Sequence, residues 1–234
     1  MPDLSNFEIA QAFREPGCPL CRVLAADEER EMQQFWRDSR LLPLVRRSFL
    51  DNGGFCPRHA WLLHEQVTRA GRGGALTDLY EALAARDQGR IERLVASSEG
   101  NPEAFARQLH EFIHASGCFA CQELEAATER RSHFARQLLQ EEGMFEAYVR
   151  SDGFCYRHLG GVLVDAGEHA PALASALLRD WNERLSRLRH ELAEFEWKRD
   201  YRRANEPRGV EQEAPTHAVS RYAGEQPDNP KERS

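Results

Sequence analysis

The sequence predicts an all-α protein in which one helical unit is duplicated, and three observations carry this prediction. Strong helix-forming residues fill long runs without an internal breaker. Proline and glycine residues stand at the ends of these runs, where they start and stop helices. No segment alternates apolar and polar residues with the period of two that is typical of β-strands.

The first half of the chain divides into five helical segments. Ser5 and Glu8 form a capping box at the start of the first segment, and Pro16-Gly17 ends it. Pro57 stands in the first turn of the fourth segment, where its missing N–H costs nothing. We therefore expect helices over residues 7–13, 20–36, 41–50, 58–70 and 76–95.

The second half repeats this plan and then changes character. Asn101-Pro102-Glu103 supplies a helix cap, a proline at the first helical position and an acid in the first turn. Helices are expected over residues 102–115, 120–141, 144–149, 157–164 and 171–199. From about Arg203 onward large apolar residues become scarce, which predicts a disordered C-terminal tail over residues 201–234.

The duplication is visible in two pairs of motifs. The run GGFCPRH at residues 53–59 returns as DGFCYRH at residues 152–158, and GCPLC at residues 17–21 returns as GCFAC at residues 117–121. A period this long fits a single duplication better than a solenoid repeat. We expect two helical repeats, residues 1–97 and 98–200, that form a bundle with pseudo-two-fold symmetry.

All six cysteines fall into two sets of the same form, C-x2-C followed after a long spacer by C-x2-H. Three thiolates and one imidazole are an established ligand set for zinc. A disulfide scheme would leave one of three cysteines unpaired in each half. The spacer fits one helix that runs away and a second that returns, so we expect each half to close its own Cys3His site. The predicted ligands are Cys18, Cys21, Cys56 and His59 in the first half and Cys118, Cys121, Cys155 and His158 in the second.

The ligand types leave the metal open between zinc, which we favour, and an iron–sulfur cluster. Three thiolates around one zinc ion give a net charge of about −1, which Arg58 and Arg157 could offset from within the C-x-R-H segments. Glu29 and Glu129 lie about two helical turns after each C-x2-C pair. They could support the site or bind a separate metal, although an ion pair with a neighbouring arginine explains them more simply.

The paired motifs GCPLC…ER…GFCPRH and GCFAC…ER…GFCYRH resemble those of an uncharacterised family of helical, cysteine-rich prokaryotic proteins that is classed as a domain of unknown function. The resemblance covers most of residues 1–200 and leaves out the tail. It supports the pairing of the motifs and implies no activity.

Composition narrows the classes of function. A net charge of −7 disfavours a general nucleic-acid-binding surface, although Glu196–Arg203 mixes aromatic and basic residues and could contact a single strand. No stretch is apolar enough to span a membrane, and the N-terminus lacks the features of a signal peptide. These features predict a cytoplasmic protein with reduced thiols.

Three functions follow from these patterns. The first is a binding or regulatory module that two structural zinc ions clamp and that binds an unidentified protein partner through its helical surface. The second is a redox or sensor protein that holds iron–sulfur clusters on the same ligands. The third is an enzyme with a carboxylate-lined cleft around Glu29 and Glu129. No nucleophile elbow, phosphate-binding loop or dinucleotide fingerprint points to a particular reaction.

Overall fold

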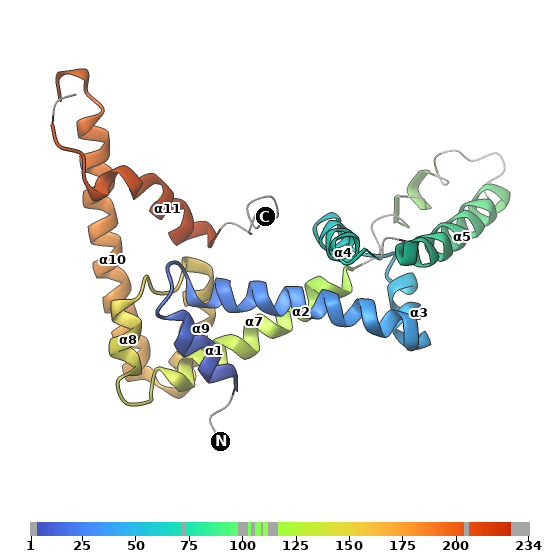
Figure 1. The fold of residues 1–234 in the computed structure, drawn as a ribbon, viewed down its shortest axis with the longest axis horizontal. Coiled ribbons are helices and arrows are strands. Elements are labelled where there is room, and N and C mark those ends of the chain that lie inside the picture. Colours follow the sequence, from blue (N-terminus) through green and yellow to red (C-terminus); the bar gives the residue numbers. More distant parts are fainter. Residues whose placement is uncertain are drawn as a thin grey trace. The chain divides into compact units, whose positions relative to one another are not determined.

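The computed structural model confirms the predicted all-α class (Figure 1). It describes residues 4–71, 74–97, 103, 106–108, 110–111, 117–203 and 206–225, and these residues contain no strand. The first-half helices are α1 (Leu4–Ala12), α2 (Pro19–Leu41), α3 (Pro43–Asp51), α4 (Pro57–Arg69) and α5 (Gly74–Ser97). The second-half helices are α7 (Phe119–Leu138), α8 (Met144–Arg150), α9 (Tyr156–His169), α10 (Pro171–Lys198) and α11 (Ala214–Ala223), with short 3-10 turns at Tyr201–Arg203 and Val210–Glu213. The helix expected over residues 102–115 lies largely outside the described residues.

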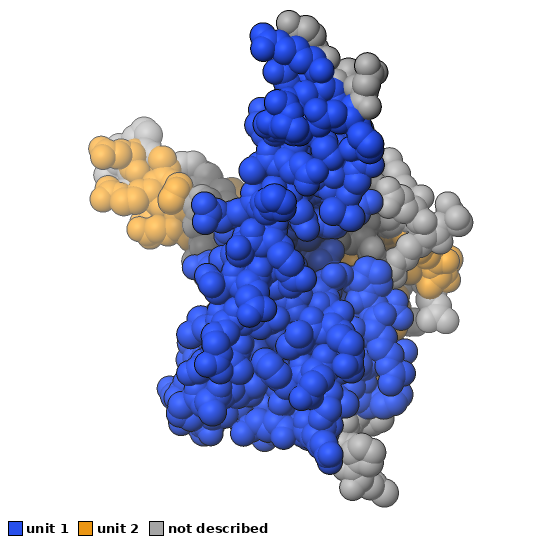
Figure 2. Space-filling model, turned by 90° about the vertical axis from the view of Figure 1, so that its left-hand side faces the viewer, with its two compact units in different colours: residues 1–25, 127–234 blue, residues 26–126 orange. Residues whose placement is uncertain are grey.

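The chain forms two compact units that mix the two halves of the sequence (Figure 2). Unit 1 contains residues 1–25 and 127–234, and unit 2 contains residues 26–126. The unit boundaries fall inside α2 and α7. These units differ from the sequential halves 1–97 and 98–200, because a repeat shows which segments are alike and not which segments pack together.

Prolines and glycines delimit the helices as the sequence predicts. Pro43, Pro57 and Pro171 each occupy the first turn of a helix, where the backbone N–H has no helical partner. Gly54, which directly precedes Phe55 and Cys56, has φ of +87°, and an added Cβ would lie 3.1 Å from a methyl carbon of Leu83. Both the backbone angle and the close packing therefore favour glycine at this position.

In the core of unit 1, the second Gly-Phe-Cys (GFC) motif, residues 153–155, packs against aromatic residues from other segments. Phe13 packs edge-on against Tyr148, with ring centroids 6.0 Å apart, and Phe154 packs on Tyr148 at 4.8 Å. Arg184 of α10 is buried, pairs with Asp180 at 2.7 Å and donates to the backbone carbonyl of Tyr148. The buried charge is thus paired, and α10 is tied to the segment that leads into the motif.

The core of unit 2 holds the first GFC motif in the same manner. Phe55 packs against Phe35 at 4.7 Å and against Phe49 at 5.3 Å. The buried residues around them are Met32, Trp36, Leu63, Val67, Leu76, Leu79 and Ala120. The phenylalanine of each GFC motif therefore anchors the neighbouring cysteine to a hydrophobic core.

The structure differs from the expected disordered tail over residues 206–225. Helix α11 packs on α9 and α10 (Figure 1), with Ala214 fully buried. The Glu211 carboxylate is also buried, and it accepts hydrogen bonds from the backbone of Gly209 and from Lys198. This segment docks on other helices and therefore does not need enough apolar residues to form a core of its own. Its composition alone does not reveal this docking. Residues 226–234 lie outside the described residues.

None of the described helices combines the length and the apolar character that a membrane span requires.

Candidate metal centres

Cysteine and histidine side chains gather in two clusters within the described residues. Site 1 lies in unit 1 and contains Cys18, Cys21, Cys155 and His158. Site 2 lies in unit 2 and contains Cys56, His59, Cys118 and Cys121. Each cluster therefore combines the C-x2-C pair of one repeat with the C-x2-H pair of the other. This arrangement corrects the expectation that each half closes its own site.

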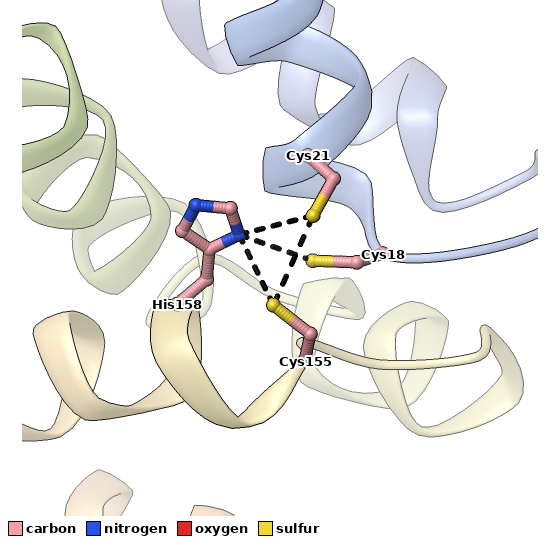
Figure 3. Close-up of side chains that lie close together, drawn as sticks. All are labelled: Cys18, Cys21, Cys155 and His158. Carbon is pink, nitrogen blue, oxygen red and sulfur yellow. Dashed lines mark hydrogen bonds between the residues drawn. The ribbon is translucent and has the colours of Figure 1, made fainter. Parts of the chain in front are cut away.

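In site 1 the imidazole of His158 faces three sulfur atoms (Figure 3). Its Nδ1 lies 3.5 Å from Sγ of Cys18, 3.4 Å from Sγ of Cys21 and 3.3 Å from Sγ of Cys155. The Sγ atoms of Cys21 and Cys155 are 3.8 Å apart. The start of α2 thus supplies two thiols, and the start of α9 supplies the third thiol and the imidazole.

Site 2 has the same geometry. Nδ1 of His59 lies 3.2 Å from Sγ of Cys56 and 3.4 Å from the Sγ atoms of both Cys118 and Cys121. The Sγ atoms of Cys56 and Cys121 are 3.7 Å apart. In each site all four ligand atoms lie within 4.8 Å of one another.

These separations fit one tetrahedral ion at the centre of each cluster. Bonds of about 2.3 Å to sulfur and about 2.0 Å to nitrogen place sulfur atoms about 3.8 Å apart and place nitrogen about 3.5 Å from each sulfur. The observed sulfur–sulfur distances of 3.8 and 3.7 Å agree with this geometry. An iron–sulfur cluster would need wider spacing, because several iron and sulfide atoms would lie between the cysteines.

Each site also lies at the N-termini of two helices. Cys56 and Cys155 are the N-cap residues of α4 and α9, and Cys18 and Cys118 immediately precede α2 and α7. A helix N-terminus acts as roughly half a positive charge. Two of them would together offset the net charge of about −1 that three thiolates and a neutral imidazole leave around a divalent ion.

A buried carboxylate supports the histidine of site 2. Glu28, which is 8% exposed, places Oε1 at 2.9 Å from Nε2 of His59 and Oε2 at 2.6 Å from the guanidinium of Arg58. This contact directs Nδ1 of the ring toward the thiols, as carboxylates behind metal-bound histidines do. Arg58 in turn offsets the charge of Glu28.

The electrostatics of site 2 favour a bound cation. The Glu28 carboxylate raises the pKa of His59 to about 9 against the opposing effect of burial. In site 2, burial and the neighbouring thiols raise the pKa of Cys121 to about 12. Burial also acts against ionisation of Cys56, but hydrogen bonds from His59 outweigh it and lower the pKa of this thiol to about 7. The three thiols of site 2 therefore do not all ionise together at neutral pH unless a cation is present, and a bound metal deprotonates its thiol ligands.

The other predicted site residues lie in varied places. Arg58 pairs with Glu28, which in turn contacts His59 of site 2, and Arg157, at the equivalent position of the second repeat, is exposed. Glu29 is half-buried and Glu129 is exposed. Neither of these two glutamates belongs to a metal-capable cluster in the described part of the chain.

Sequence reasoning missed Glu28 for a specific reason. At the repeat offset it corresponds to Thr128, so the duplication gives no signal for a shared carboxylate. It also follows Cys21, which belongs to site 1, whereas it contacts His59 of site 2. Glu28 could be predicted only if one already knew that each site combines the C-x2-C pair of one repeat with the C-x2-H pair of the other.

A polar cavity of about 470 Å³ adjoins site 1 in unit 1. Arg187, Arg221 and Glu225 are among its lining residues, whereas Glu29 and Glu129 are not. The carboxylate-lined enzyme cleft therefore remains a prediction without support from this cavity.

Comparison with known proteins identifies the family of this chain but no activity. Among curated proteins and among solved structures, no match to the chain was found. Residues 2–229 match the model of DUF6062, a family of unknown function. The match extends past residue 200 and includes α11, which the motifs alone did not indicate. Since it covers nearly the whole chain and both Cys/His clusters, the chain belongs to the DUF6062 family.

Proposed function

We propose that this protein is a helical binding or regulatory module in which sites 1 and 2 each hold one structural zinc ion. The single observation that supports this proposal best is the spacing of the ligand atoms. Sulfur–sulfur distances of 3.8 and 3.7 Å match the edge of a tetrahedron around one ion.

The proposed ions stabilise the fold rather than perform chemistry. Four protein ligands fill a tetrahedral zinc ion and leave no position for water or substrate. Each ion would join chain segments that are far apart in the sequence, since Cys21 and Cys155 are 134 residues apart and Cys56 and Cys121 are 65 apart. Structural zinc in small domains contributes an apparent binding free energy of about 10–16 kcal/mol. Each unit would therefore depend on its ion for stability.

The thiolate ligands favour a reducing compartment, so we place the protein in the cytoplasm. A protein partner is the expected target of the module. Large apolar side chains on unit 2 support this part of the proposal, because Leu41, Leu44 and Trp61 are 77%, 79% and 69% exposed. Substitution of Leu41 and Leu44 by serine should weaken capture of that partner while the metal content stays unchanged.

Elemental analysis with a visible spectrum, on protein purified without oxygen, tests the proposal. About two zinc ions per chain and no colour are expected if each site binds one ion. Iron with acid-labile sulfide would favour the iron–sulfur alternative. Iron without sulfide would keep the single-ion geometry but change the metal. Protein with neither metal would contradict the proposal.

A further inference from the structure

The two sites share one ligand set but differ in their exposure. In site 1, Cys18 and Cys155 are 4% and 2% exposed, and Cys21 is half-buried. In site 2, Cys121 is exposed and Cys56 and Cys118 are half-buried. The reactivity of a thiolate toward oxidants follows its exposure. The chemically equivalent sites should therefore react differently.

The C-terminal segment covers site 1. The backbone N–H of Glu225 donates to Sγ of Cys21 over 3.5 Å, and Oε1 of Glu225 accepts from the backbone N–H of Cys18 over 3.0 Å. A Cβ added to Gly224 would lie 3.0 Å from Sγ of Cys21. Glycine at this position thus lets the backbone pack directly on the sulfur. Cys18 and Cys155 also border the polar cavity, yet their small exposed fractions leave little sulfur surface for solvent there.

The first repeat has no sequence counterpart of this cover. Residues 173–188 correspond to residues 79–94 at an offset of 94. Residues 102–115 in turn stand at the same distance before the second C-x2-C pair as residues 2–15 do before the first. The first repeat therefore runs from its long helix almost directly into the segment that precedes the next C-x2-C pair. The segment with α11 is an addition to the second repeat alone.

From these observations and the proposed zinc sites, we propose that site 2 is a thiol-oxidation site for hydroperoxides, with Cys121 as the sulfur attacked first. The C-terminal segment protects site 1 from the same reaction. Oxidation of site 2 releases its ion, while site 1 keeps its ion and holds unit 1 folded.

The reaction balances with hydrogen peroxide as the oxidant. The Cys121 thiolate attacks one peroxide oxygen, so an S–O bond forms, the O–O bond breaks and hydroxide leaves. The Cys56 thiolate, 3.7 Å away, then attacks the sulfenic sulfur, so the disulfide forms and a second hydroxide leaves. Two thiolates lose two electrons, and the peroxide becomes two water molecules after taking up two protons. With Cys56 and Cys121 joined, site 2 would keep only two of the four ligands that would hold a zinc ion, so the ion would be released.

The test uses the zinc-loaded full-length chain, hydrogen peroxide and a chromophoric zinc chelator. We expect one of the two zinc ions to be released in a fast phase, while the second stays bound. Mass spectrometry of peptides should then find a disulfide between Cys121 and Cys56. Release of both ions together, or a first disulfide within site 1, would overturn the proposal. A chain that binds no zinc before oxidation would instead refute the proposed function.

A pair of glycine variants tests the protective segment separately. Gly224→Ala places a methyl group against Cys21 and strains a backbone with φ of +88°, so it should move the segment off site 1 and bring the second zinc ion into the fast phase. Gly143→Ala is the matched control in the same unit, because φ is +75° and the added methyl group meets nothing within 4 Å. The control should retain its second ion. Equal retention in both variants would show that the segment does not protect site 1.

Discussion

Removal of the Glu28 carboxylate should weaken metal binding at site 2 and leave site 1 unchanged. Glu28 is buried and contacts both Nε2 of His59 and the guanidinium of Arg58. Glu28→Ala removes the buried carboxylate that lies 2.9 Å from Nε2 of His59 and frees the imidazole to turn away from the thiols. Loss of such a supporting group costs about 10–100-fold in metal affinity. This range corresponds to about 1.4–2.7 kcal/mol of binding free energy.

Competition with a chromophoric chelator measures this loss, and cadmium NMR assigns it, since each site gives its own resonance. Glu28→Gln should lose less affinity because its amide oxygen can still lie against the ring nitrogen. Glu65→Gln serves as the control, because Glu65 pairs with Arg69 at 2.7 Å on the same helix and belongs to neither Cys/His cluster. Unchanged affinity of site 2 in Glu28→Ala would refute the supporting role of this carboxylate.

Three further substitutions have defined outcomes. Cys56→Ser removes a thiolate of site 2, so the zinc content should fall by one ion per chain and the melting temperature should drop. If both values stayed unchanged, Cys56 would not be a metal ligand. Arg184→Met leaves Asp180 buried without its partner, so denaturant unfolding should show that the free energy of unfolding falls by about 3–5 kcal/mol. A decrease as small as that for a surface ion pair would argue against a buried ion pair. Burial acts to raise the pKa of Asp165, but Arg136 outweighs it and lowers this pKa. The carboxylate therefore stabilises the fold above its unfolded pKa of about 3.9 and loses this effect as the pH falls through the lowered folded value. Asp165→Asn should lower the melting temperature at neutral pH, and the difference from wild type should vanish in strong acid; a difference that persists there would contradict the assignment.

The fold class and the ligand residues could be predicted because local chemistry encodes them. Pro43, Pro57 and Pro171 start helices for a reason that lies within a few residues of each proline. The duplicated Cys/Cys/Cys/His set likewise selects ligands by type and spacing alone. These signals can be read from the sequence without knowledge of the tertiary structure.

The pairing of the ligand pairs could not be predicted in this way. Because GCPLC and GCFAC are nearly alike, each is chemically suited to either GFCxRH motif. The choice depends on which helices share a core, and buried residues such as Phe35 and Phe154 establish that only in the folded chain. The order of residues 206–225 escaped prediction for a similar reason, since Glu211 and Ala214 are buried against helices that lie earlier in the sequence.

The crossed pairing is the central claim, and zinc counting on two double variants tests it most directly. Cys18→Ser with Cys155→Ser removes two ligands of site 1, so native mass spectrometry should find one zinc ion per chain. Cys18→Ser with Cys56→Ser removes one ligand from each site, so both ions should be weakened or lost. If each half of the sequence instead closed its own site, the first variant would lose both ions and the second would keep one. That reversed result would contradict the account.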